Sequence, residues 1–575
     1  MFDVVIRGGR VIDGSGSEAF HADVALEGDR IAEVGRVSSR GAREIDADGR
    51  LVVPGFVDPH THFDAQMTWD PLLDPSSHHG VTTVVTGNCG VGFAPARPDR
   101  HDWLIGVMAG VEDIPAAALA EGLPWGWEHF HEFMDVLDAQ PRAMDIATLA
   151  THGPIRAYVM GDRCEGREEP TPAELAAMVE LARGALASGA LGFSTSRTSM
   201  HLSLEGIPVP STYASWGELR AFAEVLQQAG GAIFQLALPN SFEEPERIEE
   251  DLATMLELSV ELSVPFTFNF AINHDDPEHW GRLCAMIEAG AERGARVHPM
   301  VLGRPHSVLV GFQGLHPFAR CPAYLELAEL PLAERVVRLA DSETRARILA
   351  EDPLPPDPAD PFGDFYDFAP EHLYRLGDRP DYEPAPEQSL AAVARQRGGD
   401  PRGVLYDLLL AQEGRAFLLY VVMNYPGQDL EAVREMVLHP QSVLGLSDAG
   451  AHCGSVCDGS APTSMLTHWC RDRKSGEGLP LPWMVRALSS EPAALFGLRD
   501  RGLLQPGMKA DVNVIDFEAL ACEPPEMRYD LPTGARRLAQ GASGYAYTLL
   551  SGEVIREEGA DTGARPGRLV RGRGA

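Results

Sequence analysis

Short hydrophobic runs separated by turns mark both ends of the chain, and longer runs alternating with helical patterns fill the middle. Over residues 1–52, runs such as Val4-Val5-Ile6 and Val24-Ala25-Leu26 follow one another with glycines between them, which predicts a small antiparallel β unit. Residues 500–560 show the same pattern. We expect these two segments to pair into one β-sandwich beside a central domain.

The central part, residues 53–499, alternates β-branched apolar runs with stretches of helical spacing. This alternation is typical of parallel βα units, whose strands are buried on both faces. Eight such runs predict an α/β fold with a TIM-like (β/α)8 barrel, in which catalytic groups sit at the carboxyl ends of the strands. The candidate strands are 51–60, 81–88, 145–151, 189–195, 231–237, 264–272, 295–302 and 443–448.

A long interval between the seventh and eighth candidate strands predicts an insertion around residues 305–440. It contains a proline-rich, acidic segment at 351–361, which aromatic residues such as Phe362 and Phe365 follow. The insertion is either a lid over the barrel mouth or a surface excursion without a catalytic role. The tail at 561–575, rich in arginine and glycine, is expected to be flexible or to lie against a partner subunit.

Charge and composition exclude some classes of partner. The chain has 48 basic and 84 acidic residues, a net charge of −36, which argues against nucleic acid or an anionic membrane as a partner. It shows neither a secretory signal nor a run of 18 or more apolar residues, so we expect a cytoplasmic protein. Its eight cysteines are scattered, which indicates reduced thiols rather than a disulfide framework.

The candidate chemistry lies at the ends of three predicted strands. His60 and His62 follow the first strand and point to the same face, because side-chain direction repeats every second residue. Cys89 ends the second strand and Asp448 the eighth. Two imidazoles, a thiolate and a carboxylate make a complete ligand set for Zn²⁺. Asp448 is also placed to accept a proton from a metal-activated water and later return it to a leaving amine.

Several motifs together resemble the metal-dependent amidohydrolase superfamily, and most closely its N-acyl-D-amino-acid deacylase (D-aminoacylase) branch. They cover nearly the whole chain in the expected order. These motifs include Ile12-Asp13-Gly14-Ser15-Gly16, Pro54-Gly55-Phe56-Val57-Asp58-Pro59-His60-Thr61-His62, Gly87-Asn88-Cys89-Gly90, Ser447-Asp448 and Pro506-Gly507-Met508-Lys509-Ala510-Asp511. The resemblance implies a TIM-like barrel flanked by a β-sandwich from both termini. It also implies that Cys89 bridges two metal positions, with His60, His62 and Asp448 at the outer one.

The chain departs from that family on strands five and six. The second metal position needs one histidine from each strand, but Gln235 and Asn269 stand where these are expected, and the next histidine is His274. Three interpretations follow: one metal ion remains on the four ligands named above, other histidines rebuild a second position, or the metal site is degraded. One zinc ion is favoured over two. The histidines considered for rebuilding the site are His152, His274, His298 and His452.

Substrate contacts are expected from strand ends four and seven. An N-acyl amino acid carries a carboxylate, which arginine binds in bidentate fashion, and Arg197 and Arg304 follow those strands. Alternatively, each arginine pairs with one of the many acidic residues. His152 and His298, near the ends of strands three and seven, are expected to face the pocket. Gln235, Asn269 and His452 are further candidates for substrate contact.

These features together predict a metal-dependent amidohydrolase. It would cleave the C–N bond of a small amide, an N-acyl-D-amino acid or a related N-acyl or cyclic amide, by attack of metal-bound hydroxide with Asp448 as general acid and base. The alternatives are a deaminase- or lyase-like enzyme on the same scaffold, and a non-catalytic barrel protein with a degraded metal site. The superfamily resemblance also makes a homo-oligomer an expectation.

Overall fold

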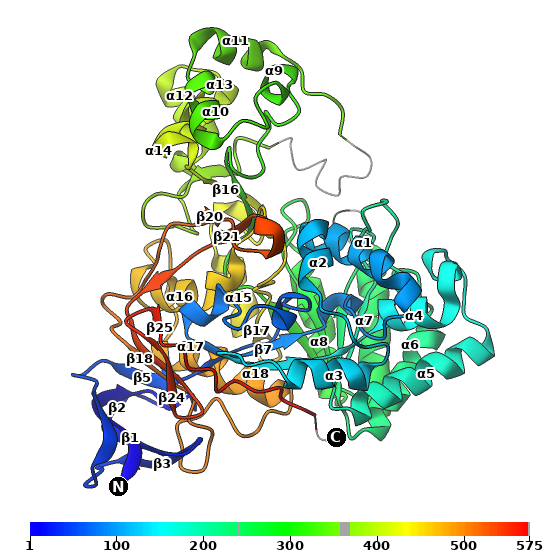
Figure 1. Ribbon diagram of the computed structural model, residues 1–575, viewed down its shortest axis with the longest axis vertical. Helices are drawn as coiled ribbons and strands as arrows, with labels where there is room; N and C mark the ends of the chain where they lie inside the picture. The colour runs from blue at the N-terminus through cyan, green and yellow to red at the C-terminus, as the bar shows by residue number, and fades with distance from the viewer. Residues whose placement is uncertain (240–241, 243, 357–367, 573–575) are drawn as a thin grey trace.

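A computed structural model of the chain describes residues 1–239, 242, 244–356 and 368–572. Its strands form a β domain built from both ends of the chain and a parallel barrel between them (Figure 1). The predicted α/β class, with a barrel and a terminal β domain, is confirmed. The exact limits given above for the two domains stay predictions.

The terminal β domain is a hydrogen-bonded sheet to which both ends of the chain contribute. Strand β1 changes partner along its length, because Phe2 to Arg7 pair with β4 whereas Arg10 and Val11 pair with β5. The apolar side chains of the two ends share one cluster, in which Ile6 and Leu26 lie with Val512 and Leu549. The strands are β1 (Phe2–Val11), β2 (Phe20–Glu27), β3 (Arg30–Gly35), β4 (Gly41–Asp46), β5 (Leu51–Pro54), β18 (Val512–Ile515), β23 (Tyr545–Leu550), β24 (Glu553–Glu557) and β25 (Ala560–Asp561).

The barrel strands run parallel and pair in chain order. They are β6 (Phe56–Asp58), β7 (Val81–Thr86), β8 (Asp145–Thr148) with β9 (Ala150–Thr151), β10 (Gly192–Ser196), β11 (Ile233–Ala237), β12 (Phe266–Phe270), β13 (Val297–Val301) and β17 (Val443–Leu444). The third strand is interrupted at Leu149, whose N–H still bonds to Thr86. A parallel bridge between Thr61 and Ala449 joins the first strand to the eighth, so these contacts connect all eight positions into a ring.

Helices surround the strands, which explains why the strands read as continuous apolar runs. Neighbouring helices along the chain contact one another, for example α5 with α6 and α7 with α8. The helices of this part are α1 (His101–Glu112), α2 (Ala116–Gly122), α3 (Phe130–Asp138), α4 (His152–Met160), α5 (Pro172–Ala187), α6 (Trp216–Gln228), α7 (Pro245–Leu262), α8 (His279–Glu292), α15 (Glu431–Leu438), α16 (Ala461–Ser464), α17 (Leu481–Leu488) and α18 (Ser490–Leu495). Within the described residues, no helix combines the length and apolar character needed to cross a membrane.

Most of the predicted strands differ from the structure by a few residues at their ends, and two differ in a way that the backbone explains. The run 51–60 divides at Gly55 between the terminal sheet and the barrel, and a Cβ at Gly55 would overlap the Thr82 side chain. The eighth strand covers only Val443–Leu444 of the expected 443–448. It stops early because Leu446 (φ 60°) and Asp448 (φ 46°) adopt left-handed backbone conformations, which cannot continue a strand.

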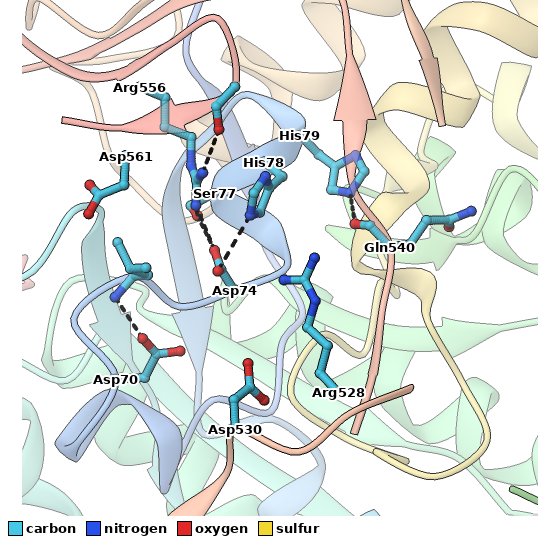
Figure 2. A network of polar contacts seen from close by, with 12 residues as sticks. Asp70, Asp74, Ser77, His78, His79, Arg528, Asp530, Gln540, Arg556 and Asp561 are labelled. Carbon is cyan, nitrogen blue, oxygen red and sulfur yellow. Dashed lines mark hydrogen bonds and ion pairs between the residues drawn. The ribbon is translucent and has the colours of Figure 1, made fainter. Parts of the chain in front are cut away.

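A buried polar network joins the terminal β domain to the segment that precedes β7 (Figure 2). Arg556 of β24 donates to Asp74 at 2.8 Å and to Ser77 at 2.6 Å. Beside them, His78 Nε2 lies 3.4 Å from Asp74 Oδ2, and His79 Nε2 shares a hydrogen bond of 2.9 Å with the carbonyl of Gln540. These contacts tie the two β systems together at the side of the barrel.

The insertion forms a helical unit with its own core. Its helices are α9 (Pro322–Leu325), α10 (Leu332–Leu339), α11 (Ser342–Ala350), α12 (Leu390–Arg397), α13 (Pro401–Leu409) and α14 (Ala411–Gly414). They stand at the upper end of Figure 1, and the antiparallel strands β14 (His306–Val310), β15 (Leu373–Arg375) and β16 (Leu418–Met423) connect them to the barrel. Phe362 and Phe365 lie outside the described residues.

The expected flexible tail is corrected for the part that the structure describes. Residues 566–572 run along the base of the barrel, where Ile146 donates to the carbonyl of Arg568 and Val570 donates back to Ile146. Gly572 then donates to Gly189. The glycine- and arginine-rich composition indicated disorder, but these backbone groups find partners on the third strand and before the fourth.

Candidate metal centre

His60 and His62 lie just beyond β6, at the carboxyl end of the barrel. The chain just after β6 still pairs with both neighbouring segments. The N–H of Thr61 donates to the carbonyl of Val85 at 3.1 Å, and the N–H of His62 donates to the carbonyl of Ala449 at 2.8 Å. The extended backbone places the two imidazoles on the same side, with ring centroids 5.3 Å apart. Both side chains are buried.

Cys89 lies on the tight turn after β7, with a left-handed backbone (φ 56°). Its N–H donates to Gln235 Oε1 at 2.7 Å, and the N–H of Gly90 donates to Ser194 Oγ at 3.0 Å. A Cβ on Gly90 would come within 2.7 Å of the Thr195 backbone, so this turn needs glycine. The turn therefore brings the thiol beside His60, with Cys89 Sγ 3.5 Å from His60 Nε2.

Asp448 reaches the same place from the turn after β17. This turn is fixed by Ser447, whose hydroxyl donates to Asp58 Oδ2 at 2.5 Å. Asp58 also accepts from the N–H of His60 at 3.3 Å, so one buried carboxylate holds the ends of strands one and eight together. Left-handed residues concentrated at one place are typical of functional sites.

Four groups of the kinds that bind metals converge at this point. His60, His62 and Cys89 offer ligand atoms that all lie within 4.8 Å of one another, and within the described residues no other group of three or more was found. Asp448 Oδ1 is 3.3 Å from His60 Nε2 and 3.7 Å from His62 Nε2, and Cys89 Sγ is 3.5 Å from His60 Nε2. All four residues predicted as ligands are therefore together.

Buried acidic groups surround the convergence point. Burial raises the pKa of Asp58, Asp64 and Asp448 to about 7 each. It also raises the pKa of Glu112 and of the Cys89 thiol well above the ordinary values. Ionising several carboxyl groups that are buried close together costs free energy when no cation is present. A divalent ion would therefore reverse these rises in pKa. The side chains present therefore fit a metal ion.

Glu112, on α1, was not anticipated from the sequence. Its Oε1 lies 3.1 Å from Nδ1 of His62, the ring nitrogen that faces away from Asp448. A carboxylate this close behind the ring places negative charge there, which favours a cation at the other ring nitrogen. Glu112 is the last residue of α1, and no sequence motif surrounds it, so only the tertiary structure brings it to the site.

Gln235 and Asn269 form a hydrogen-bonded ring with Cys89. Gln235 Oε1 accepts from the Cys89 N–H, Gln235 Nε2 donates to Asn269 Oδ1 at 3.2 Å, and Asn269 Nδ2 donates to Cys89 Sγ at 3.7 Å. The two amides therefore use their polar groups on each other and on the cysteine. Neither presents a nitrogen lone pair, as a histidine would.

Of the four histidines considered as replacement ligands, only His452 lines the cavity at the site. His152 is buried between Thr195 Oγ1 and Glu218 Oε1, at 2.8 Å from each. His298 shares a hydrogen bond with the Gln441 carbonyl at 3.1 Å. His274 accepts from the N–H of Tyr425 at 3.0 Å. The expectation that His152 and His298 face the pocket is thus corrected.

Arg304 and Arg197 are also engaged away from the cavity surface. Buried Arg304 pairs with Asp458, donates to Ser460 at 3.1 Å, and stacks 4.1 Å above the ring of Tyr382. Arg197 donates to Asp251 at 2.6 Å and to a backbone carbonyl. The alternative in which each arginine pairs with an acidic residue therefore describes both.

A cavity of about 310 Å³ opens beside the convergence point. Asp448, Asn269 and His452 line it, together with His201 and His306, which the sequence analysis did not single out. His306 begins β14 and Met423 ends β16, so the base of the insertion forms one wall. The insertion thus contributes to the pocket through its connecting strands.

The family model described as "Amidohydrolase family" matches residues 43–556. The chain belongs to this family. It is 28% identical to D-aminoacylase from Alcaligenes xylosoxydans xylosoxydans over 99% of this chain and 97% of that protein. It is therefore a metal-dependent hydrolase that acts on carbon–nitrogen bonds other than peptide bonds, and its substrate is a small-molecule amide.

Two solved structures extend the comparison to the metal. A structure of D-aminoacylase, described as having a binuclear metal centre with one-metal activation and second-metal attenuation, has a TM-score of 0.64 and 27% identity, covering 99% of this chain and 100% of the other. N-acyl-D-glutamate deacylase from Bordetella bronchiseptica, in complex with zinc and a phosphonate inhibitor, has a TM-score of 0.64 and 25% identity, covering 99% of each chain.

Proposed function

We propose that the chain is a zinc amidohydrolase that cleaves small N-acyl amides with one metal ion, held by His60, His62, Cys89 and Asp448. The observation that carries the proposal is the convergence of these four side chains. The ligand atoms of His60, His62 and Cys89 lie within 4.8 Å of one another, and Asp448 Oδ1 lies 3.3 Å from His60 Nε2. Imidazole, thiolate and carboxylate together suit zinc.

One ion rather than two is favoured by strands five and six. Gln235 and Asn269 occupy the positions from which a second ion would need imidazoles, and both amides are already bonded to Cys89 and to each other. The D-aminoacylase structure described as showing one-metal activation makes a single ion chemically sufficient in a similar protein.

When bound, the zinc ion would polarise the amide carbonyl and make water more acidic. Asp448 accepts a proton from the attacking water and delivers it to the leaving nitrogen, because its carboxylate lies at the mouth of the barrel beside both histidines. Glu112 places a carboxyl group behind His62, and Asp58 keeps Asp448 close to His60 through Ser447.

The relatives named above indicate N-acyl-D-amino acids as the first compounds to screen. The test is zinc content per chain together with amine release from an N-acyl compound panel, for the wild-type protein and Asp448→Asn. We expect about one zinc per chain in the wild type. We expect the variant to fold but lose about 10²–10⁴-fold in kcat, the contribution of a general acid–base. Near-normal turnover by Asp448→Asn would overturn the mechanism.

A further inference from the structure

Histidines are prominent on the lining of the cavity beside the candidate metal centre. Among the described residues that line it, none is an arginine or a lysine, but His201, His279, His306 and His452 all contribute. A neutral imidazole carries one N–H donor, and a carboxylate accepts hydrogen bonds from such groups. A substrate carboxylate can therefore be met by a histidine in this pocket.

Three of these histidines already interact with other parts of the chain. His201 Nδ1 shares a hydrogen bond of 2.9 Å with Ser196 Oγ. His279, at the start of α8, has its Nε2 3.3 Å from Glu249 Oε1. His452 is also engaged in an interaction within the chain. Their rings are thus committed, at least in part, before a ligand arrives.

His306, at the start of β14, is different. In the described part of the chain, no hydrogen bond or ion pair involves its ring, and Nε2 is buried. The side chain is only partly buried and lines the cavity, so Nδ1 is the nitrogen that a ligand can reach. A buried N–H without an acceptor is rare, which favours the tautomer with the proton on Nδ1. His306 therefore offers an unused N–H donor to the cavity.

An irregular strand pairing places His306 at the cavity. Ser307 of β14 pairs with Val421 of β16. His306, the residue before it, pairs with Met423, which leaves Val422 as an extra residue on β16. Such a bulge re-aims side chains and is common beside active sites. Consecutive residues of both strands line the cavity as a result, namely His306 with Ser307 and Val422 with Met423.

His306 is also close enough to the candidate metal centre to act on the same substrate. Burial, and then His201 and His306, lower the pKa of His60 to about 3, so these rings interact electrostatically with a proposed metal ligand. Asp448, another proposed ligand, lines the same cavity as His306. In an N-acyl amino acid, a single carbon atom separates the leaving nitrogen from the carboxylate. A partner of the carboxylate must therefore lie near the metal centre, as His306 does.

Arg304, which follows the same barrel strand, is held away from this task. It pairs with Asp458, which lines the cavity, and its guanidinium also bonds to Ser460 and Ser464. If Arg304 turned towards a substrate, Asp458 would be left as an uncompensated buried charge. In its present place Arg304 neutralises Asp458, which lowers the repulsion between that acid and a substrate anion.

We propose that His306 binds the carboxylate of an N-acyl-D-amino acid substrate, with Nδ1 donating a hydrogen bond to one of its oxygens while the amide lies at the candidate metal centre. This rests on the proposed function, since it concerns the substrate of the same site. His306 then determines specificity, because it holds the leaving group by its carboxylate and positions the scissile bond. A compound without the carboxylate lacks this contact.

Two compounds that differ only in the carboxylate test the proposal, N-acetyl-D-phenylalanine and N-acetyl-2-phenylethylamine. Phe268, Phe270 and Trp280 line the cavity, so both compounds can place their ring on an apolar surface. In the zinc-loaded full-length protein, His306→Phe should lower kcat/KM for the acid by about tenfold or more and change that for the neutral compound by no more than about twofold. Damage to the fold would lower both. Equal losses for the two compounds, or no loss for the acid, overturn the proposal.

His306→Asn and His279→Gln are the matched variants. Asparagine keeps an N–H donor close to the position of Nδ1, so part of the kcat/KM for the acid should return. His279 lines the same cavity but pairs with Glu249, so His279→Gln should leave the ratio of kcat/KM between the acid and the neutral compound within about twofold. A ratio that falls as far in His279→Gln as in His306→Phe would overturn the assignment to His306.

A binding measurement keeps the proposal distinct from the proposed hydrolysis. Isothermal titration of zinc-loaded Asp448→Asn, or of the wild type if it turns neither compound over, gives the Kd of both compounds. Adding His306→Phe should raise the Kd of the acid by about tenfold and leave that of the neutral compound within about twofold. If neither compound is hydrolysed and this pattern holds, hydrolysis of these amides fails while the carboxylate site stands. If the acid does not bind, or binds equally well without His306, the carboxylate site fails whatever the turnover.

Discussion

The two sides of the barrel mouth are built from similar strand ends but have opposite chemistry. On one side, the turns after β6, β7 and β17 bring together His60, Cys89 and Asp448, groups that bind or carry charge. On the other side, β11 and β12 present Gln235 and Asn269, neutral amides that satisfy each other. The backbone framework is the same, so side-chain type alone decides which side can hold a metal ion.

The amide side nevertheless contributes to the metal side. Gln235 accepts the Cys89 N–H at 2.7 Å, and Asn269 points its amide at the thiol. These bonds hold the cysteine turn in its left-handed conformation and direct the sulfur at the two histidines. The two amides that stand in place of a second pair of ligand histidines therefore support Cys89, a ligand of the first metal position.

Removing a ligand from the charged side should have the largest effect. In Cys89→Ala, zinc content should fall from about one per chain to almost none, because losing a ligand costs more than the roughly 10–100-fold in affinity that an outer-shell change costs. Cys284→Ala, which removes another buried thiol on α8, is the matched control and should keep its zinc. Elemental analysis after gel filtration measures both, and full zinc content in Cys89→Ala would contradict the ligand set.

Adding ligands to the amide side should change the metal number. In the double variant Gln235→His plus Asn269→His, zinc should rise from about one to about two per chain, because imidazoles then complete a second position beside Cys89. A double change to leucine, of similar bulk and without donors, should leave the number at one or below. If the histidine variant is folded and still binds one ion, the amides are not what limits the metal number.

Part of this comparison could be predicted from the sequence, because it depends on local rules. The alternation of directions along a strand placed His60 and His62 together, and the common end of parallel strands added Cys89 and Asp448. The replacement of two histidines by Gln235 and Asn269 was equally visible. Each of these inferences needs only residue type and position within a strand.

The rest depends on contacts between distant segments. Arg304 follows strand seven as a substrate-binding arginine would, but its partner Asp458 is 154 residues further along the chain. Glu112 reaches His62 from a helix without any motif. The tail has the composition of a disordered segment, yet the edge of strand three supplies its backbone partners. Left-handed turns, as at Asp448, shortened strand eight although its hydrophobic pattern continued.

Weakening the support behind a ligand should have a smaller effect than removing it. In Glu112→Gln, zinc affinity should fall by about 10–100-fold, because the negative charge behind His62 is lost. Competition with a chelator measures the affinity, and Glu121→Gln, an exposed change on α2, is the control. Unchanged affinity in Glu112→Gln would remove this residue from the metal side of the comparison.

The smallest effect is expected at a histidine that the fold keeps out of both sides. His298 bonds to the Gln441 carbonyl at 3.1 Å and does not line the cavity. In His298→Gln, the new amide can still donate to that carbonyl, so zinc content should stay the same and kcat/KM should change by no more than about twofold. Zinc loss in this variant, with a circular dichroism spectrum like that of the wild type, would mean that strand seven takes part in metal binding. The charged side of the mouth would then extend beyond strands one, two and eight.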